Sequence, residues 1–333
     1  MSGSYTYPAG VPINPQLPPP NGEAAISIFG YIPNRAFAIV ALVTFCIAVI
    51  FHTFYLVRVR GTRTFYGLMV FGGICEIVGY GARLKAASNP FIVNGFVIQY
   101  FFIVVAPVFF QSAFYIAVAS ALKRLEGGGT ALLGFNPKLL VAFMITADVF
   151  TTIVQIIGAA LIGVAESSAY DNGGKSSTIS PKQANDILLA GLSLQTASFL
   201  AFLMLLGLCA YRSRGVTQSR GLPIKFSVVL FISSLLVFLR TTFRLAETAE
   251  GVFSYASRTE GLFAGLEYVP VILAVLLFAA FPLHKLLPAA HEATAASVAA
   301  VDEKPEEGLQ PGVSNMSSPT LVRPGSGEVH ETK

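Results

Sequence analysis

The sequence predicts an all-α, polytopic membrane protein built as a bundle of seven transmembrane helices. Of its 333 residues, 54% are hydrophobic and only 12% are charged, whereas about 25% of a soluble globular domain is charged. The hydrophobic residues gather in seven stretches, each long enough to cross a hydrocarbon core about 30 Å thick. These stretches are Phe37–Val57, Thr64–Leu84, Asn94–Leu122, Leu139–Val164, Ile187–Tyr211, Ile224–Ala246 and Gly261–Leu283.

The first three spans differ in their polar content. The first is an apolar run that ends at Arg58, and we expect it to act as the signal anchor. The second carries Glu76, Tyr80 and Arg83, and residues at i, i+4 and i+7 share one face of a helix. The third carries Gln99 and Pro107, and the proline is expected to kink the helix.

The last four spans repeat the pattern of polar residues on one helix face. Charges in a bilayer cost about 2.5–3.5 kcal/mol each on the insertion scale, so they persist where they pair or line a polar site. We therefore expect each of these helices to turn a polar face inward, and we expect a second kink at Pro270. The polar residues are Asp148 and Gln155 in the fourth span, Gln195 in the fifth, Arg240, Arg244 and Glu247 in the sixth, and Glu260 and Glu267 in the seventh.

Basic residues in the short loops predict the orientation. Lys and Arg gather in the cytosolic loops of membrane proteins, and more of them lie near Arg58, Lys123 and Arg212 than near Arg35 and Lys85. We expect the N-terminus outside and the C-terminus in the cytosol. Most of the polar residues then lie in the outer half of the membrane, which predicts a polar vestibule open to the non-cytosolic side. Arg240 or Arg244 should lie within ion-pair distance of Glu76, Asp148 or Glu267. The alternative is that these groups only hold the helices together.

The two ends of the chain differ in composition from the spans. Residues 1–36 are rich in Pro and Gly and show no removable signal peptide. Residues 289–333 mix Ala, Ser, Pro and Glu and offer too little apolar area to fold alone. We expect a disordered extracytoplasmic N-terminus over residues 1–36, a transmembrane domain over 37–288 and a disordered cytosolic tail over 289–333.

The sequence gives no support for an enzyme, a cofactor or a metal site. The four histidines, His52, His284, His291 and His330, are not clustered as a catalytic zinc site requires, and no Gly-rich phosphate loop is present. The cysteines lie inside apolar spans without metal-ligand spacing. The net charge of +4 belongs mostly to loops at helix ends, so we expect no nucleic-acid partner.

Taken together and in order, these motifs resemble the fungal lipid-translocating exporter family, also called RTA-like. Members share a first-span tyrosine and proline, the pattern E-x-x-G-Y-x-x-R, a third-span glutamine and proline, the pattern R-x-x-F-R-x-x-E-x-x-x-G, and two seventh-span acids before a proline. The chain departs from the family at Gln111, Ala264, Glu267 and Phe281-Pro282. The matching residues are Tyr31 with Pro33, Glu76 to Arg83, Gln99 with Pro107 and Tyr115, Asp148 with Gln155, Gln195, Arg240 to Gly251, and Glu260 with Glu267 and Pro270.

The resemblance implies transport or flipping of an amphiphilic lipid, such as a sphingoid long-chain base, in a fungal plasma membrane or endomembrane, with resistance to toxic amphiphiles as the result. Glu76, Asp148 and Glu267 would receive an ammonium head group, and Arg240 and Arg244 would hold these acids or bind a phosphate. Gln99, Gln155 and Gln195 would complete the site. Three alternatives stay open: a non-transporting seven-helix receptor or sensor, a lipid-sequestering stress-resistance protein, and a porphyrin or haem transporter. The expected partners are membrane lipids or other amphiphilic small molecules.

Overall fold

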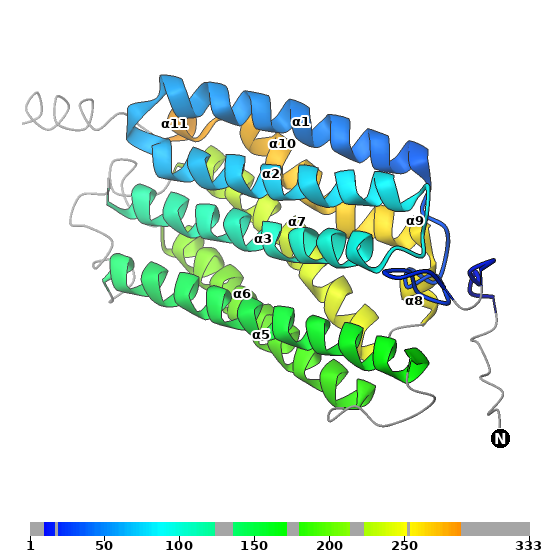
Figure 1. The fold of residues 1–333 in the computed structure, drawn as a ribbon. Helices are drawn as coiled ribbons and strands as arrows, with labels where there is room; N and C mark the ends of the chain where they lie inside the picture. Colours follow the sequence, from blue (N-terminus) through cyan, green and yellow to red (C-terminus); the bar gives the residue numbers. More distant parts are fainter. Residues whose placement is uncertain are drawn as a thin grey trace, which may run out of the picture. The chain divides into compact units, whose positions relative to one another are not determined.

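The computed structural model describes residues 10–16, 19–123, 136–171, 180–213, 223–251 and 254–287. Among these residues, seven helical segments are long and apolar enough to cross a membrane (Figure 1). Five of them lie within single helices, the second consists of η1 and α2, and the seventh is a composite of α9, η2 and α10. The elements are α1 Arg35–Arg58, η1 Arg60–Thr62, α2 Arg63–Ala86, α3 Val93–Leu122, α5 Pro137–Asp171, α6 Pro181–Ser213, α7 Ile224–Glu250, α8 Tyr255–Arg258, α9 Glu260–Leu262, η2 Phe263–Tyr268, α10 Val269–Ala280 and α11 Leu283–Leu286. The predicted all-α, seven-span fold is confirmed.

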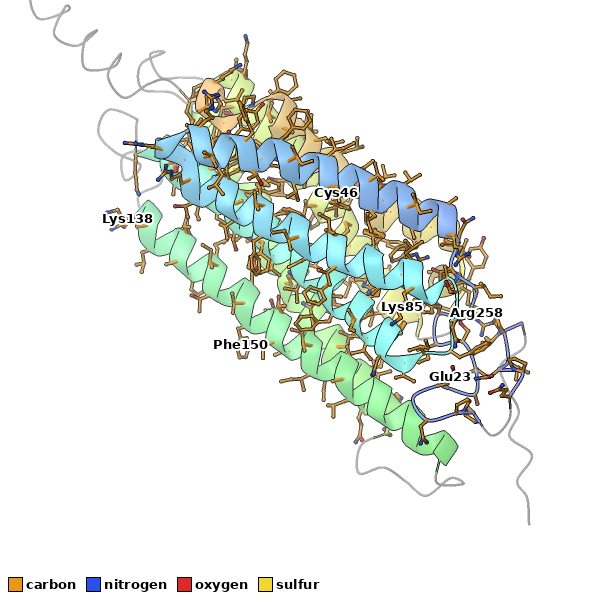
Figure 2. All side chains as sticks on the ribbon, turned by 45° about the horizontal axis from the view of Figure 1, so that its top comes forward. Glu23, Cys46, Lys85, Lys138, Phe150 and Arg258 are labelled. Atoms are coloured by element: carbon orange, nitrogen blue, oxygen red, sulfur yellow. The ribbon has the colours of Figure 1, made fainter. Side chains whose placement is uncertain are left out.

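The long helices form one bundle whose core is aromatic. Helix α2 lies between α1 and α3, α5 lies against α6, and α7 contacts both α6 and α10 (Figure 1). Phe45, Phe110 and Phe199 are buried in the core. Phe150 points outward from α5 and is 60% exposed (Figure 2). Large apolar side chains on the outer faces are expected where lipid replaces water as the solvent.

Two glycines allow helices to approach closely. A Cβ at Gly158 of α5 would lie 2.6 Å from the backbone nitrogen of Leu188 in α6, and a Cβ at Gly79 of α2 would lie 2.6 Å from Ile103 in α3. Small residues at such contacts let helix backbones pack closely, which matters in lipid because the hydrophobic effect does not drive helices together there. Gly79 therefore allows the polar face of α2 to pack closely against α3.

The two prolines occupy different positions in their helices. Pro107 lies inside α3, which continues to Leu122. Pro270 lies in the first turn of α10, directly after the π-helix η2. Because proline has no backbone N–H, it cannot complete the hydrogen-bond ladder of the preceding turn, and a π-turn is a common local adjustment that often occurs at functional sites. Glu267 lies in this π-turn.

Part of the N-terminal segment lies against the bundle. Residues 10–16 and 19–34, within the segment 1–36 that the composition predicts to be disordered, pack on the end of the bundle that carries Lys85 and Arg258, opposite Lys138 (Figure 2). The backbone N–H of Ala24 donates to Phe91 O at 2.8 Å, and Ile26 and Phe29 are buried. Composition alone does not reveal these partners, because they come from the α2–α3 loop and α3. Residues 1–9 and the predicted tail at 289–333 lie outside the described residues.

Candidate functional site

At the end of the bundle covered by the N-terminal segment, Arg83 joins several parts of the chain. Its Nη2 donates to Glu260 Oε1 at 2.6 Å and to the Tyr31 hydroxyl at 2.8 Å. The guanidinium also lies over the Phe263 ring, 4.5 Å from its centroid. Burial raises the pKa of Tyr31 above its usual value, against the opposing effect of Arg83, so this hydroxyl stays a neutral partner.

Glu260 extends this contact to the start of α1. Its two carboxylate oxygens accept hydrogen bonds from the backbone N–H of Asn34, at 2.9 and 3.1 Å. The Asn34 side chain in turn accepts from the Ala36 N–H and caps α1. Tyr31, α1, α2 and α9 are thus held together by the Arg83–Glu260 pair.

Deeper in the bundle, Arg240 of α7 pairs with Glu267 of η2. Arg240 Nη2 donates to Glu267 Oε1 at 2.6 Å and to the backbone carbonyl of Ile103 in α3 at 2.9 Å. The side chains are 3% and 1% exposed. The predicted ion pair between the sixth and seventh spans is therefore present, and it also fixes α3.

Glu76 lies beside this pair but has no partner of its own. The carboxylate is 2% exposed and interacts electrostatically with both Arg240 and Glu267. None of the described residues forms a hydrogen bond or an ion pair with it. One turn further along α2, the Tyr80 ring stacks on Phe45. Glu76 is thus a buried acid next to an arginine that already has a carboxylate.

Arg244 is placed differently from the expectation. It pairs with Glu247 of its own helix, with 2.7 Å between Nη1 and Oε2, and lies over the Tyr100 ring, 4.6 Å from its centroid. It forms no ion pair with Glu76, Asp148 or Glu267 in the described part of the chain. Because residues three apart share a helix face, the local glutamate takes the place of a partner on another helix.

A second polar group lies between α3, α5 and α6. The Tyr115 hydroxyl donates to Asp148 Oδ2 at 2.7 Å. Gln155 donates to Gln195 at 2.6 Å, and Gln195 donates to Gln111 at 3.2 Å. No hydrogen bond or ion pair of the described residues joins this group to Arg240 and Glu267. The predicted common site is therefore divided into separate groups.

Sequence reasoning left Gln111 out of the site and noted it only as a departure from the family pattern. Gln111 lies one turn before Tyr115 on α3, and this i, i+4 spacing was the available signal. Tyr31 was also left out of the site, since nothing in a Pro-rich segment reveals that it reaches a buried arginine. Gln99, which was predicted, is buried, and its Oε1 has no hydrogen-bond partner.

The buried charges do not balance within the described residues. The three buried arginines each pair with one glutamate: Arg83 with Glu260, Arg240 with Glu267 and Arg244 with Glu247. Two buried acids, Glu76 and Asp148, have no arginine. Burying an ionised carboxylate without a cation is costly. Glu267 Oε2 and Arg240 Nε are also buried without a hydrogen-bond partner, and such groups in native structures call for an explanation.

Two pockets lie away from the charged group. An open groove of about 470 Å³ lies along α1 and α2 and is lined by Arg35, Ile39 and Lys85 among others. A small apolar pocket lies between Tyr115 and Phe202. Neither is lined by Glu76, Arg240 or Glu267, so the expected vestibule stays a prediction for a conformation that opens. No group of three His, Cys, Asp or Glu side chains suited to a metal ion occurs among the described residues.

Comparison with known proteins gives a family match over most of the transmembrane region. The family model described as "RTA1 like protein" matches residues 69–290. No solved structure matches the chain.

Among curated proteins, the chain is similar to three from Saccharomyces cerevisiae. The sphingoid long-chain base transporter RSB1 of strain Lalvin EC1118 is 30% identical over 178 residues, which are 53% of this chain and 43% of the transporter. The protein RTM1 is 25% identical over 224 residues, 66% of this chain and 68% of RTM1. The protein RTA1 is 24% identical over 221 residues, 64% of each chain. The chain thus spans less than half the length of the transporter that it matches.

Proposed function

Because the chain belongs to the RTA1-like family, an integral membrane family of fungal cells, we propose that it moves an amphiphilic lipid with a cationic head group between membrane leaflets. A sphingoid long-chain base is the substrate class that the name of one relative suggests. Such a molecule has an ammonium group at one end and a hydrocarbon chain at the other. Its movement away from a sensitive compartment would confer resistance to toxic amphiphiles.

The observation that carries this proposal is the buried Glu76 carboxyl group, which forms no ion pair within the described residues. Its carboxylate is buried beside the Arg240–Glu267 pair and has no cation of its own. Glu267 Oε2 is also unpartnered. An ammonium group has three donors and one positive charge, so it would supply what these two carboxylates lack.

The surrounding groups can orient the ligand. Gln99 lies one turn before Ile103 on α3, and the Ile103 carbonyl accepts from Arg240. In this proposal, Gln99 Oε1, which is buried without a hydrogen-bond partner, would accept from the same ammonium. Arg240 would hold Glu267 in position. The second group, with Asp148, Gln155 and Gln195, would provide a polar path between α3, α5 and α6. The hydrocarbon chain needs no buried pocket, because it can remain among the lipid chains.

The Arg83–Glu260–Tyr31 contact would close the site at the end covered by the N-terminal segment. This contact joins Tyr31 to α2 and α9, so its release would be required for the head group to leave at that end. In this proposal Arg83, Glu260 and Tyr31 control access, and Glu76 and Glu267 bind.

Reconstitution tests this function. Purified protein in vesicles should move a fluorescent long-chain base between leaflets faster than protein-free vesicles do. Glu76→Gln and Glu267→Gln keep the size and the hydrogen-bonding capacity but remove a charge, and we expect each to slow the movement about tenfold or more, the equivalent of about 1.4 kcal/mol. The exposed Glu250→Gln is the matched control. If both buried variants fold and move the base at the wild-type rate, the acids are structural and do not bind the head group. If the wild-type protein moves no base, the receptor alternative takes precedence.

A further inference from the structure

We propose that Glu76 carries a proton when the site is empty and that the ammonium group of the substrate replaces this proton, so that the protein exchanges a base for a proton. This inference rests on the proposed function and adds the energy source. It begins from three charged groups in one buried place: Glu76 of α2, Arg240 of α7 and Glu267 of η2.

Among the described residues, the cation that acts on Glu76 is Arg240, and it already pairs with Glu267. Helix α3 has no charged residue, and the charged residues of α1 lie at its two ends. The Cys75 thiol and the hydroxyl groups of Tyr80 and Tyr100 supply no positive charge. Other titratable groups of the neighbouring elements have partners elsewhere, among them His52 of α1, Arg83 of α2, Tyr115 of α3, Arg244 and Glu247 of α7, Glu260 of α9 and Tyr268 of η2.

One arginine cannot neutralise two carboxylates. With both Glu76 and Glu267 ionised, this buried group would carry one net negative charge at a position where each side chain is at most 3% exposed. A buried group in that situation takes up a proton instead of staying ionised. Glu267 already pairs with Arg240, with 2.6 Å between Oε1 and Nη2, whereas no ion pair of the described residues includes Glu76. The proton therefore belongs on Glu76.

An ammonium group and a proton are interchangeable here because each carries one positive charge. When a base enters, the Glu76 carboxylic acid gives its proton to water on the side of entry, and the carboxylate pairs with the ammonium. When the base leaves on the other side, a proton from that side returns to the carboxylate. The net charge of the buried group is the same in both states, so the exchange is electroneutral and the base moves towards the more acidic compartment.

The test uses the full chain in vesicles with a pH-sensitive dye inside. A primary amine would collect on the acidic side without any protein, since its neutral form crosses lipid. The probe is therefore the N,N,N-trimethyl derivative of fluorescent sphingosine, whose positive charge is permanent. It keeps the charge that pairs with the Glu76 carboxylate but has no N–H donor, so the unmodified fluorescent base is measured beside it to show that the protein transports. We expect it to accumulate on the acidic side against its own gradient, with a proton moving in the opposite direction for each molecule of base. Clamping the membrane potential with potassium and valinomycin should leave the rate unchanged.

Several outcomes separate this inference from the proposed function. If the probe only reaches equal concentrations whatever the pH gradient, or follows the membrane potential, the exchange is refuted while the transport function stands. If wild-type protein moves no base at all, the proposed function fails and the inference with it. Glu76→Gln should reduce the proton movement about tenfold or more, whereas the exposed Glu250→Gln should not. The assignment of the exchanged proton to Glu76 would be overturned by either of two results. In one, a folded Glu76→Gln protein still moves protons; in the other, the proton movement is lost only in Asp148→Asn.

Discussion

At the scale of single residues, the buried Arg240–Glu267 pair connects three helical elements of the bundle. It joins α7 to η2 and, through the Ile103 carbonyl, to α3. Replacing a buried pair with apolar residues often costs little, whereas removing one member leaves a charge without a partner. The pair is therefore a strong constraint on any single change at either position, whatever its role in binding.

We expect Arg240→Met to lower the free energy of unfolding by about 3–5 kcal/mol, because Glu267 loses its cation in a buried place. The double variant Arg240→Met with Glu267→Met should recover most of this loss. Thermal unfolding in detergent measures both. Equal destabilisation by the single and double variants would show that packing, and not the charge pair, determines stability here.

The sequence predicts which face of each helix turns inward, but it does not predict which charged side chains form ion pairs. The helical period was enough to place Glu76, Arg83, Arg240 and Glu267 in the interior, and all four are buried. It could not show that Arg83 pairs with Glu260, or that Arg244 turns to its own helix. Those choices depend on the relative depth and rotation of helices that are far apart in the sequence.

At the scale of elements, α5 and α6 are in contact because Gly158 lets the Leu188 backbone approach. We expect Gly158→Ala to lower the free energy of unfolding by about 1–3 kcal/mol, because the new methyl group forces the two helices apart. Gly207 of α6 is the matched control, since a Cβ there meets nothing within 4 Å. Gly207→Ala should be neutral or stabilise the helix by about 1 kcal/mol. Melting temperatures in detergent decide between these outcomes.

The N-terminal segment behaves as an additional element attached through Tyr31. Tyr31→Phe removes the hydroxyl that accepts from Arg83 at 2.8 Å, and a hydrogen bond to a charged group contributes about 1.5–3 kcal/mol. We expect faster backbone hydrogen exchange over residues 24–34 in this variant. Tyr255→Phe changes a side chain that is 78% exposed and should leave the exchange as in the wild type. Unchanged exchange in Tyr31→Phe would mean that Ile26 and Phe29 hold the segment without Arg83.

Composition alone could not predict the contacts of this segment, because the residues that it contacts are far away in the sequence. A stretch rich in Pro and Gly has few apolar residues with which to build a core. Here Asn89 donates to Glu23, and the Phe91 carbonyl accepts from Ala24. The apolar surface that buries Ile26 and Phe29 is also supplied by the folded chain. Only the assembled bundle provides these contacts.

At the scale of the whole molecule, the buried ion pairs are distributed unevenly along the length of the bundle. The Arg83–Glu260 and Arg240–Glu267 pairs lie towards the end where the N-terminal segment packs. Towards the other end the contacts are mostly aromatic and apolar, with Phe65 and Phe278 buried. The side of the membrane that the polar end faces determines the direction of the exchange proposed for Glu76.

The last prediction concerns the orientation of the chain in the membrane, and it rests on the basic residues of the short loops. Basic residues in short loops favour the cytosolic side, and they are more frequent at the end near Arg58, Lys123 and Arg212 than at the end near Arg35 and Lys85. The N-terminal segment should therefore face outward. A tag after Lys333 should resist protease added to intact cells, and a tag before Met1 should be removed. Detergent-permeabilised cells, in which both tags should be cut, are the control. Digestion of the C-terminal tag alone in intact cells would reverse the orientation, and the polar end with Glu76 would then open towards the cytosol.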